Sequence, residues 1–466
     1  MKKLLSLLLS LLLLAGLVPA AGAEGLPPMN TTDKIQLTYC VFRDEALYNH
    51  LAEKFHEMYP NITVRIINTG SVDDQAAALA NMSATKQMPD IFQFAYVDSI
   101  IANGWALDIT QYVQNDPEYQ QVFDSLKRDG YIDGKRCFFV PTVYFPITIY
   151  LDRNIFNTLN MEMPPYDWTW EDMIDLMQNM TSRRDQIWAY NAYYGIYDYG
   201  PSILSENAIG SYGWDGERYH FENGFADCFW QEAEFRRLGY RADADPTFQA
   251  LVGDTWPGIS GKVAMQLDAW WTMNTTYVLD SVKERGIDMI PYVLPKSSTV
   301  ENSNQQAWVD HAAISQTCKY PREAYEFLSY VSYATAGWEE KIWAIKNLKD
   351  NNGKPIYSYA EFLPITNNEE VWTQFRTLFD ENDYWDGFFA NCRNPISFSH
   401  QVVPGYNAFN NDVIWNGDYN GVIGLLFAVE SGVANPYDYV DMLNEKGMEY
   451  YNNAMEIFYA NYGRAE

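Results

Sequence analysis

The chain has 466 residues, of which 47% are hydrophobic and 20% charged, a globular composition with enough length for two or three core-bearing units. The formal net charge of −29 disfavours nucleic acids and anionic membrane surfaces as partners, because an acidic protein repels phosphate groups. Aromatic residues reach 16%, so rings are available to line a cleft, although core packing is the default interpretation.

The N-terminal segment has the pattern of a secretory signal. Two lysines precede an apolar run from Leu4 to Val18, and the small-x-small sequence Ala-Gly-Ala ends at Ala23. Because the run is too short for a membrane-spanning helix, we predict a signal peptide over residues 1–23, cleaved after about Ala23, and a linker over 24–32. The mature protein is then expected to be exported, to a periplasm or to the extracellular space.

The following segment predicts alternating strands and helices: a strand at 35–40, a helix at 45–58, a strand at 63–67, a helix from 71 to 82 and a strand at 91–94. In the first helix, Leu47, Leu51 and Phe55 recur at helical spacing. This alternation favours a parallel sheet with crossover helices. Ligands bind such sheets at the carboxyl ends of the strands, which directs attention to the residues that follow the first and third strands.

The middle and the end of the chain continue the α/β pattern. Residues 137–140 and 146–150 are extended runs that we expect to be broken at Pro141. Later helices are predicted to begin at Thr169, with Asp172 completing a cap, at Pro321, and at Pro436, from which the chain is helical toward its end.

Motifs of catalysis and metal binding are missing from the sequence. The five cysteines, at positions 40, 137, 228, 318 and 392, are widely separated and include no C-x-x-C pair, so zinc ribbons and thioredoxin-type redox sites are disfavoured and burial is expected. The sequence contains no nucleophile elbow, phosphate-binding loop, dinucleotide fingerprint or H-E-x-x-H motif. We therefore expect no catalytic residues, no metal and no cofactor.

The order of several short segments is similar to that of family 1 extracellular solute-binding proteins of bacterial ABC importers. The matching segments are Phe55–Val64, Met88–Ile91, Gly104–Asp108, Asp133–Pro141, Tyr150–Arg153, Phe156–Trp170, Gly261–Trp270, Gly286–Lys296 and Ala313–Ala324. Each is weak alone, but together they cover nearly all of the mature chain in the family's order. The resemblance is more specific for the fold than for the ligand.

This resemblance implies a two-lobed periplasmic-binding-protein-like fold of type II, with mostly parallel sheets flanked by helices and a hinge between the lobes. The first lobe is expected to comprise 33–142 plus about 303–350. The second is expected to comprise 143–302 plus about 351–466, with C-terminal helices. Chain crossings are expected near Pro141–Phe145 and Pro295–Asn302.

The resemblance also implies a function. Such a protein captures a carbohydrate, here expected to be an oligosaccharide, in the cleft between the lobes and delivers it to the permease subunits of an ABC transporter. A monomer that closes around its ligand is expected. One departure from the family pattern is that Leu14-Ala15-Gly16 is followed by Leu17, where a lipid-anchored cysteine is common. No lipid anchor is therefore expected.

A sugar site needs flat rings for stacking and planar polar side chains for hydroxyl groups. The residues that follow predicted strands or match ligand-facing positions of the family are Arg43, Asp44, Tyr96, Asp98, Tyr144, Trp214, Asp268, Trp270, Trp271 and Trp308. For several of them a structural role is an alternative. Asp44 and Asp98 suit helix caps, Tyr144 suits hinge packing, and one tryptophan of the 270–271 pair suits the core.

Two functional alternatives remain open at this level. A secreted glycoside hydrolase needs only a pair of carboxylates, and 61 acidic residues supply many candidates. A binding protein for a peptide or polyamine would suit the acidic charge. The abundance of tryptophan among the candidate residues favours a sugar.

Overall fold

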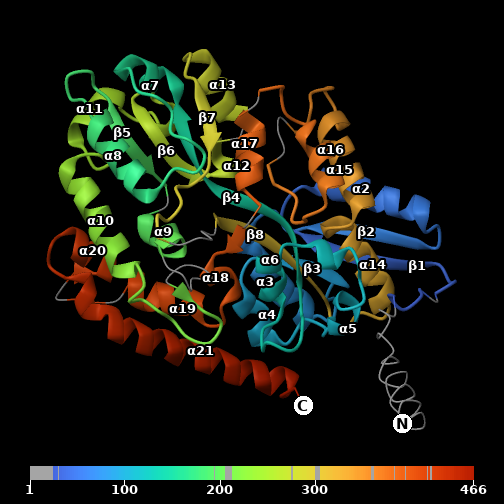
Figure 1. The fold of residues 1–466 in the computed structure, drawn as a ribbon. Helices are drawn as coiled ribbons and strands as arrows, with labels where there is room; N and C mark the ends of the chain where they lie inside the picture. Colours follow the sequence, from blue (N-terminus) through green and yellow to red (C-terminus); the bar gives the residue numbers. More distant parts are fainter. Residues whose placement is uncertain are drawn as a thin grey trace, which may run out of the picture.

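The computed structural model describes residues 25–29, 31–193, 195–204, 213–273, 276–299, 305–357, 361–382, 384–393, 395–416, 418–419 and 422–465 (Figure 1). The predicted signal peptide lies outside these residues, as does part of the expected crossing at Pro295–Asn302. Within the described part of the chain, no helix combines the length and the apolar character needed to cross a membrane.

The first lobe is built on three parallel strands: β1 (Ile35–Val41), β2 (Ile62–Asn68) and β3 (Ile91–Phe94). Helix α2 (Glu45–Met58) buries its periodic apolar residues, and α3 (Val72–Ala84) is capped by Ser71, whose hydroxyl accepts from the Asp74 amide at 3.1 Å. The lobe also contains α4 (Val97–Asn103), α14 (Pro321–Ser332) and α15 (Thr335–Asn347). The predicted elements of this region are confirmed.

The second lobe contains β5 (Trp188–Ala192), β6 (Val263–Ala269) and β7 (Met289–Tyr292). Its helices are α7 (Arg153–Leu159), α8 (Trp170–Met180), α9 (Ile196–Leu204), α10 (Phe225–Leu238), α11 (Pro246–Val252), α12 (Trp270–Met273) and α13 (Thr276–Glu284). Helix α8 begins at the predicted capping box: Thr169 Oγ1 accepts from the Asp172 amide, and the Asp172 carboxylate accepts from the Thr169 amide.

Two long strands join the lobes. The strand order is β2-β1-β3-β8-β4-β6-β5, in which β4 (Val140–Asp152) and β8 (Gln305–Ile314) are antiparallel neighbours. β4 pairs with β8 as far as Pro146 and with β6 from Ile147 onward, so one strand belongs to both lobes. Figure 1 shows β4 and β8 running between the two halves of the molecule.

The expected break of the chain at Pro141 is wrong. Residues 140–152 form one continuous strand, in which the pairing register with β8 shifts between Pro141 and Val143. Proline has no amide hydrogen, and strands tolerate it at such irregularities. The shift therefore accommodates Pro141 without ending the strand.

After α15 the chain crosses between the lobes again. The helices α16 (Glu369–Arg376) and α17 (Tyr384–Asn391) lead to the short strand β9 (Pro395–Ser397), which pairs with β8. Helices α18 (Ser399–Val402) and α19 (Tyr406–Phe409) come next. The chain then continues through a π-helical segment (Asn410–Trp415), the hairpin of β10 (Asp418–Tyr419) and β11 (Val422–Ile423), and α20 (Leu425–Glu430).

The C-terminal helix α21 (Val440–Tyr462) contacts both lobes. The prediction of a terminal helix is confirmed, with a single 3-10 turn at Pro436–Tyr439 before it. Near its start, Asn444 Oδ1 accepts from the Phe221 amide at 2.9 Å. Near its end, the Tyr462 hydroxyl accepts from the Ala106 amide at 3.0 Å and lies 3.1 Å from the Ile100 carbonyl oxygen. Figure 1 shows the helix running along one side of the whole molecule.

All five cysteines are free thiols. Four of them are buried and Cys318 is partly exposed, which agrees with the packing role expected from their spacing. Burial raises the pKa of the Cys137 thiol to about 12, so this thiol stays protonated and unreactive at neutral pH.

Replacement of Phe458 by alanine tests how firmly α21 is attached to the first lobe. Phe458 is fully buried, with its ring centroid 5.4 Å from that of Phe138. We expect Phe458→Ala to lower the free energy of unfolding by about 3–5 kcal/mol, measured by denaturant titration, because the cavity cannot fully collapse. The exposed Glu456 on the same helix provides the control variant Glu456→Ala, which should change stability little. Equal effects of the two substitutions would contradict this packing.

Candidate functional site

The loop after β1 is tied to the joining strand β8 by an ion pair. Arg43 Nη2 donates to Asp310 Oδ1 at 3.1 Å, and its guanidinium carbon lies 4.7 Å from the ring centroid of Phe145 on β4. The Trp308 indole nitrogen donates to the same Asp310 oxygen at 3.1 Å. A residue following the first strand therefore meets side chains of both joining strands, as expected for an interlobe site.

Asp44 begins α2 but does not cap it with its side chain. Its backbone is left-handed, with φ of 57°, and its carboxylate makes no hydrogen bond to the described residues. Burial raises the pKa of this carboxyl to about 7; Arg43 opposes the shift, while Glu361 and Asp310 add to it. The alternative interpretation of Asp44 as a helix cap is thus not realised, and the carboxylate is available to a ligand.

Aromatic side chains of both lobes form a continuous wall beside these charges. The Trp271 ring, on α12, lies 5.4 Å from Phe145 and 6.3 Å from Trp308, measured between centroids. The Tyr96 ring, which follows β3, lies 6.1 Å from Trp308. The His400 ring on α18 lies 5.8 Å from Tyr96 and 5.7 Å from Trp308. We call these five residues the ring wall; all except the buried Phe145 are partly exposed.

The structure thus brings together five of the ten predicted site residues: Arg43, Asp44, Tyr96, Trp271 and Trp308. Four other members of the cluster, Phe145, Asp310, Glu361 and His400, were missed by the sequence reasoning. Two of them had a signal in the sequence. Alternate side chains of a strand lie on the same face, so Asp310 is expected on the cleft side together with Trp308. By the same rule the neighbours Tyr144 and Phe145 lie on opposite faces, and only one of them can line the cleft.

Tyr144 and Trp270 lie apart from this cluster. Tyr144 points to the other face of β4, is fully buried and donates from its hydroxyl to the Cys392 carbonyl at 2.7 Å. Trp270 is also fully buried, and its ring is stacked on Phe388 of α17 with a centroid distance of 5.2 Å. The expectation that Trp270 and Tyr144 stack on the ligand does not fit this arrangement, because core contacts occupy both rings.

Asp98 and Asp268 are engaged with backbone amides. Asp98 Oδ1 accepts from the Gly405 amide at 2.7 Å, which ties α4 to the start of α19. Asp268 is fully buried at the end of β6, and its Oδ1 accepts from the Ala269 amide at 2.8 Å. Burial raises the pKa of each carboxyl to about 6. Their contact with a ligand stays a prediction that the geometry does not favour.

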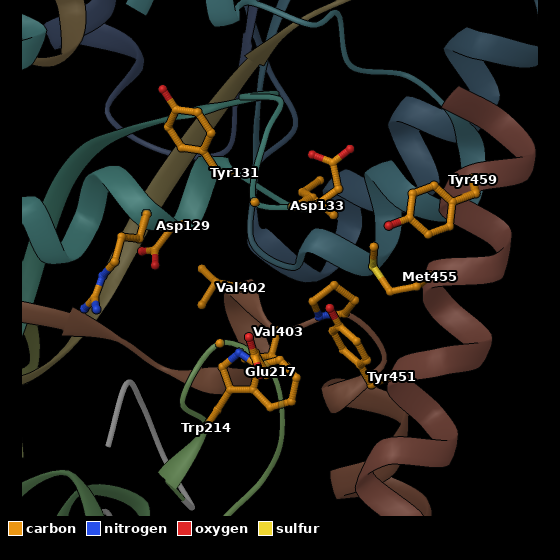
Figure 2. A pocket seen from close by; sticks show the side chains of 15 residues that line it. Asp129, Tyr131, Asp133, Trp214, Glu217, Val402, Val403, Tyr451, Met455 and Tyr459 are labelled. Atoms are coloured by element: carbon orange, nitrogen blue, oxygen red, sulfur yellow. The ribbon is translucent and has the colours of Figure 1, made fainter. Parts of the chain in front are cut away.

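Trp214 lies at a different cavity, shown in Figure 2. This cavity has a volume of about 560 Å³ and lies between a first-lobe loop with Tyr131 and Asp133 and the α21 residues Tyr451 and Tyr459. The Trp214 ring is only 6% exposed, since it packs against Tyr219 and Tyr451. Helix α18 stands between the two regions: His400 belongs to the ring wall, whereas Val402 lines the cavity.

The arrangement at the ring wall suits the binding of a ligand with apolar faces and polar groups. Partly exposed rings offer flat apolar faces, while Arg43, Asp44 and Glu361 offer hydrogen-bonding groups at one end. Among the described residues, no three histidine, cysteine or acidic side chains are placed to hold a metal ion.

A serine, an aspartate and a histidine also lie close together, in an order unlike that of a catalytic triad. Ser397 Oγ donates to Asp129 Oδ2 at 2.5 Å, while His311 is fully buried with its Nε2 3.7 Å from the same oxygen. The serine bonds to the aspartate instead of the histidine, which is not the arrangement of a Ser-His-Asp triad.

Replacement of Asp44 by asparagine tests its unusual ionisation. Since the folded carboxyl binds its proton more tightly than the unfolded one, it lowers stability as pH rises from about 4 to about 7. We expect Asp44→Asn, which suits the left-handed backbone, to raise stability by about 2 kcal/mol at pH 8 and to change it little at pH 4. Thermal unfolding at both pH values measures this. Asp124→Asn, at a side chain 94% exposed, is the control. An equal effect of Asp44→Asn at both pH values would contradict a raised pKa.

Comparisons with known proteins agree with this architecture. Residues 43–338 match the family described as bacterial extracellular solute-binding protein. No curated protein matches the chain. An ABC substrate-binding protein from Listeria monocytogenes in complex with cycloalternan has a TM-score of 0.63 at 16% identity, over 91% of this chain and 100% of that one.

Two further solved structures have similar scores. The sugar-binding protein MalE of Xanthomonas citri has a TM-score of 0.68 at 12% identity, covering 91% of this chain and 99% of that chain. A cyclic alpha-maltosyl-1,6-maltose binding protein from Arthrobacter globiformis has a TM-score of 0.64 at 14% identity, covering 90% and 99%. These likenesses establish the two-lobed fold. Together with the family match over more than half of its length, they show that the chain belongs to the bacterial extracellular solute-binding protein family.

Proposed function

We propose that this protein captures a carbohydrate between its lobes and delivers it to an ABC transporter. The observation that carries the proposal is the ring wall, a series of neighbouring rings that runs from Phe145 to Trp271 of the second lobe, then to Trp308, and from there to Tyr96 of the first lobe. The apolar faces of a sugar ring stack on such side chains, and its hydroxyl groups bond to adjacent charged groups.

The charged groups at one end of the wall complete the proposed site. Arg43 and Asp44 follow β1, and the partly exposed Glu361 interacts electrostatically with both of them. Solved structures of the same fold include proteins in complex with cycloalternan and with maltose, which supports a saccharide. We expect an oligosaccharide rather than a single sugar ring, because the five rings of the wall come from β4, β8, α12, α18 and the residue position between β3 and α4.

Closure of the lobes follows from the shared strands. β4 and β8 carry wall residues and also connect the lobes, so a ligand that contacts Trp271 and Tyr96 together stabilises the closed arrangement. The permease then recognises the loaded form. The protein acts as a monomer and catalyses no reaction on its cargo; the family description, a solute-binding protein, supports binding without catalysis.

Replacement of Trp271 by alanine tests the site. We expect Trp271→Ala to weaken saccharide binding at least tenfold, measured by calorimetry, because a large stacking surface is lost. The panel contains maltose, longer malto-oligosaccharides, cyclic glucans and other common sugars, screened first by thermal shift of the wild-type protein. The matched control is Trp230→Ala, since Trp230 is 50% exposed on the outer face of α10.

The outcomes separate the functional candidates. Unchanged affinity in Trp271→Ala would remove the ring wall from the binding site. Failure of every saccharide to raise the melting temperature of the wild type would reject a carbohydrate ligand, and peptides and spermidine in the same screen would show which class replaces it. Recovery of a shortened saccharide after incubation would indicate a glycoside hydrolase instead.

The proposed function also requires that the protein is exported from the cytoplasm. The family is extracellular, and the first 23 residues have the pattern of a signal peptide. We expect the protein secreted by an expressing bacterium to begin at Glu24, as determined by mass spectrometry of the intact chain. A mature protein that still carries Met1 through Ala23 would contradict cleavage at this position.

A further inference from the structure

The ionisable side chains at the charged end of the ring wall include more acidic groups than basic groups. Three are carboxyl groups, from Asp44, Asp310 and Glu361, and two are bases, from Arg43 and Lys341. The positive charge of Arg43 is already paired with Asp310, whose Oδ1 lies 3.1 Å from Arg43 Nη2. With every group ionised, this set carries one negative charge in excess, and Lys341 is the only remaining base in it.

Lys341 cannot supply its full charge to the cleft. Its side chain is fully buried on α15, where Nζ donates to the Ser332 carbonyl at 3.4 Å and lies 4.2 Å from the ring centroid of Trp338. Burial lowers the pKa of Lys341 to about 7, although Asp44 opposes this shift. The pKa of Asp44 is also about 7, so above this pH Asp44 is mostly ionised while Lys341 is mostly neutral, and the set is net negative.

Several carboxylate oxygens at this end accept no hydrogen bond from the described residues. Within the described ranges, neither Asp44 nor Glu361 accepts a hydrogen bond from another side chain or amide, and both are partly exposed. Asp310 is 1% exposed, and its second oxygen, Oδ2, is buried without a partner. Burial raises the pKa of both Asp44 and Glu361, because it removes part of the water around carboxyl groups that have no hydrogen-bond donor, and a bound cation would offset this cost.

We propose that this acidic end of the cleft binds the protonated amino group of an amino sugar, an inference that rests on the proposed carbohydrate function. An ammonium group brings three donors and one positive charge, which match the unpartnered oxygens of Asp44 and Glu361 and the excess negative charge. The sugar ring that carries this group then lies against the partly exposed faces of Trp271 and Trp308.

A neutral sugar fits the aromatic surface of this site but not its charge, and a linear polyamine fits the charge but not the aromatic surface. A hydroxyl group donates one hydrogen bond and brings no charge, so the excess carboxylate persists. A polyamine brings charge, but its thin chain leaves most of the aromatic surface uncovered. An amino sugar combines the flat apolar faces that fit the wall with the cation that fits its acidic end.

Pairs of saccharides that differ in one group test this inference. Glucosamine is compared with glucose and with N-acetylglucosamine. Galactosamine and mannosamine are compared with galactose and mannose, and chitosan oligosaccharides are compared with N-acetylated oligomers of equal length. We expect the amine to bind at least tenfold more tightly than its neutral counterpart in calorimetry at pH 7.5 and low salt. In Asp44→Asn and Glu361→Gln the ratio of amine affinity to neutral-sugar affinity should fall to about one, whatever the change in affinity for the neutral sugar, and Asp124→Asn should keep the wild-type ratio.

The pH dependence gives a second readout. Besides Asp44, the groups facing this end are Arg43, Asp310, Glu361 and Lys341, and the hydroxyls of Tyr48 and Tyr357, which stay neutral because burial raises their pKa. Asp44 takes up a proton below about pH 7, so affinity for the amine should fall toward pH 5. It should fall again at alkaline pH as the amine loses its proton. In Asp44→Asn the acid-side loss should be reduced.

The outcomes distinguish this inference from the proposed function. If neutral saccharides bind as tightly as their amino counterparts, or more tightly, the inference is overturned and the carbohydrate function stands. If spermidine binds as tightly as the best amino sugar, the site selects charge alone and the inference is again overturned. If no saccharide of either kind binds, the proposed function fails as well.

Discussion

The pairing of β4 with β8 is the constraint on which the rest of the molecule depends. β4 bonds to β8 along its first half and to β6 along its second, so the two lobes share backbone hydrogen bonds instead of touching only through side chains. Because side chains alternate along a strand, these two strands present Phe145, Trp308 and Asp310 to the cleft and bury Tyr144 and His311 on other faces. The position of the site is therefore set by the register of one strand pair.

Short-range signals in the sequence were sufficient to predict most of the first lobe. Helix α2 occupies the residues that its apolar spacing predicted, and the Thr169 capping box begins α8 as expected. Pro141 misled the prediction, because its effect depends on the partner strand: a register shift in the β4–β8 pair accommodates it. No local pattern contains that information.

The candidate site was predictable only in part, for a related reason. Trp270 and Trp271 are neighbours with the same composition signal, but α17 covers the first and leaves the second beside Phe145. α17 is more than a hundred residues away in the chain, so only the tertiary structure distinguishes the two tryptophans. Glu361 and His400 likewise carry no motif, and they join the cluster through the segments that follow α15 and β9.

The C-terminal helix has a consequence for following lobe movement by fluorescence. α21 ends on the first lobe, where Arg136 donates to the carbonyl oxygens of Tyr462 and Gly463. The opposite end of the described chain also rests on this lobe, since the Thr31 amide donates to Glu323 of α14. A dye pair attached near the two chain ends would thus lie on one lobe and report almost nothing of the proposed closure, whereas moving one dye to the outer surface of α10 would place the two dyes on different lobes.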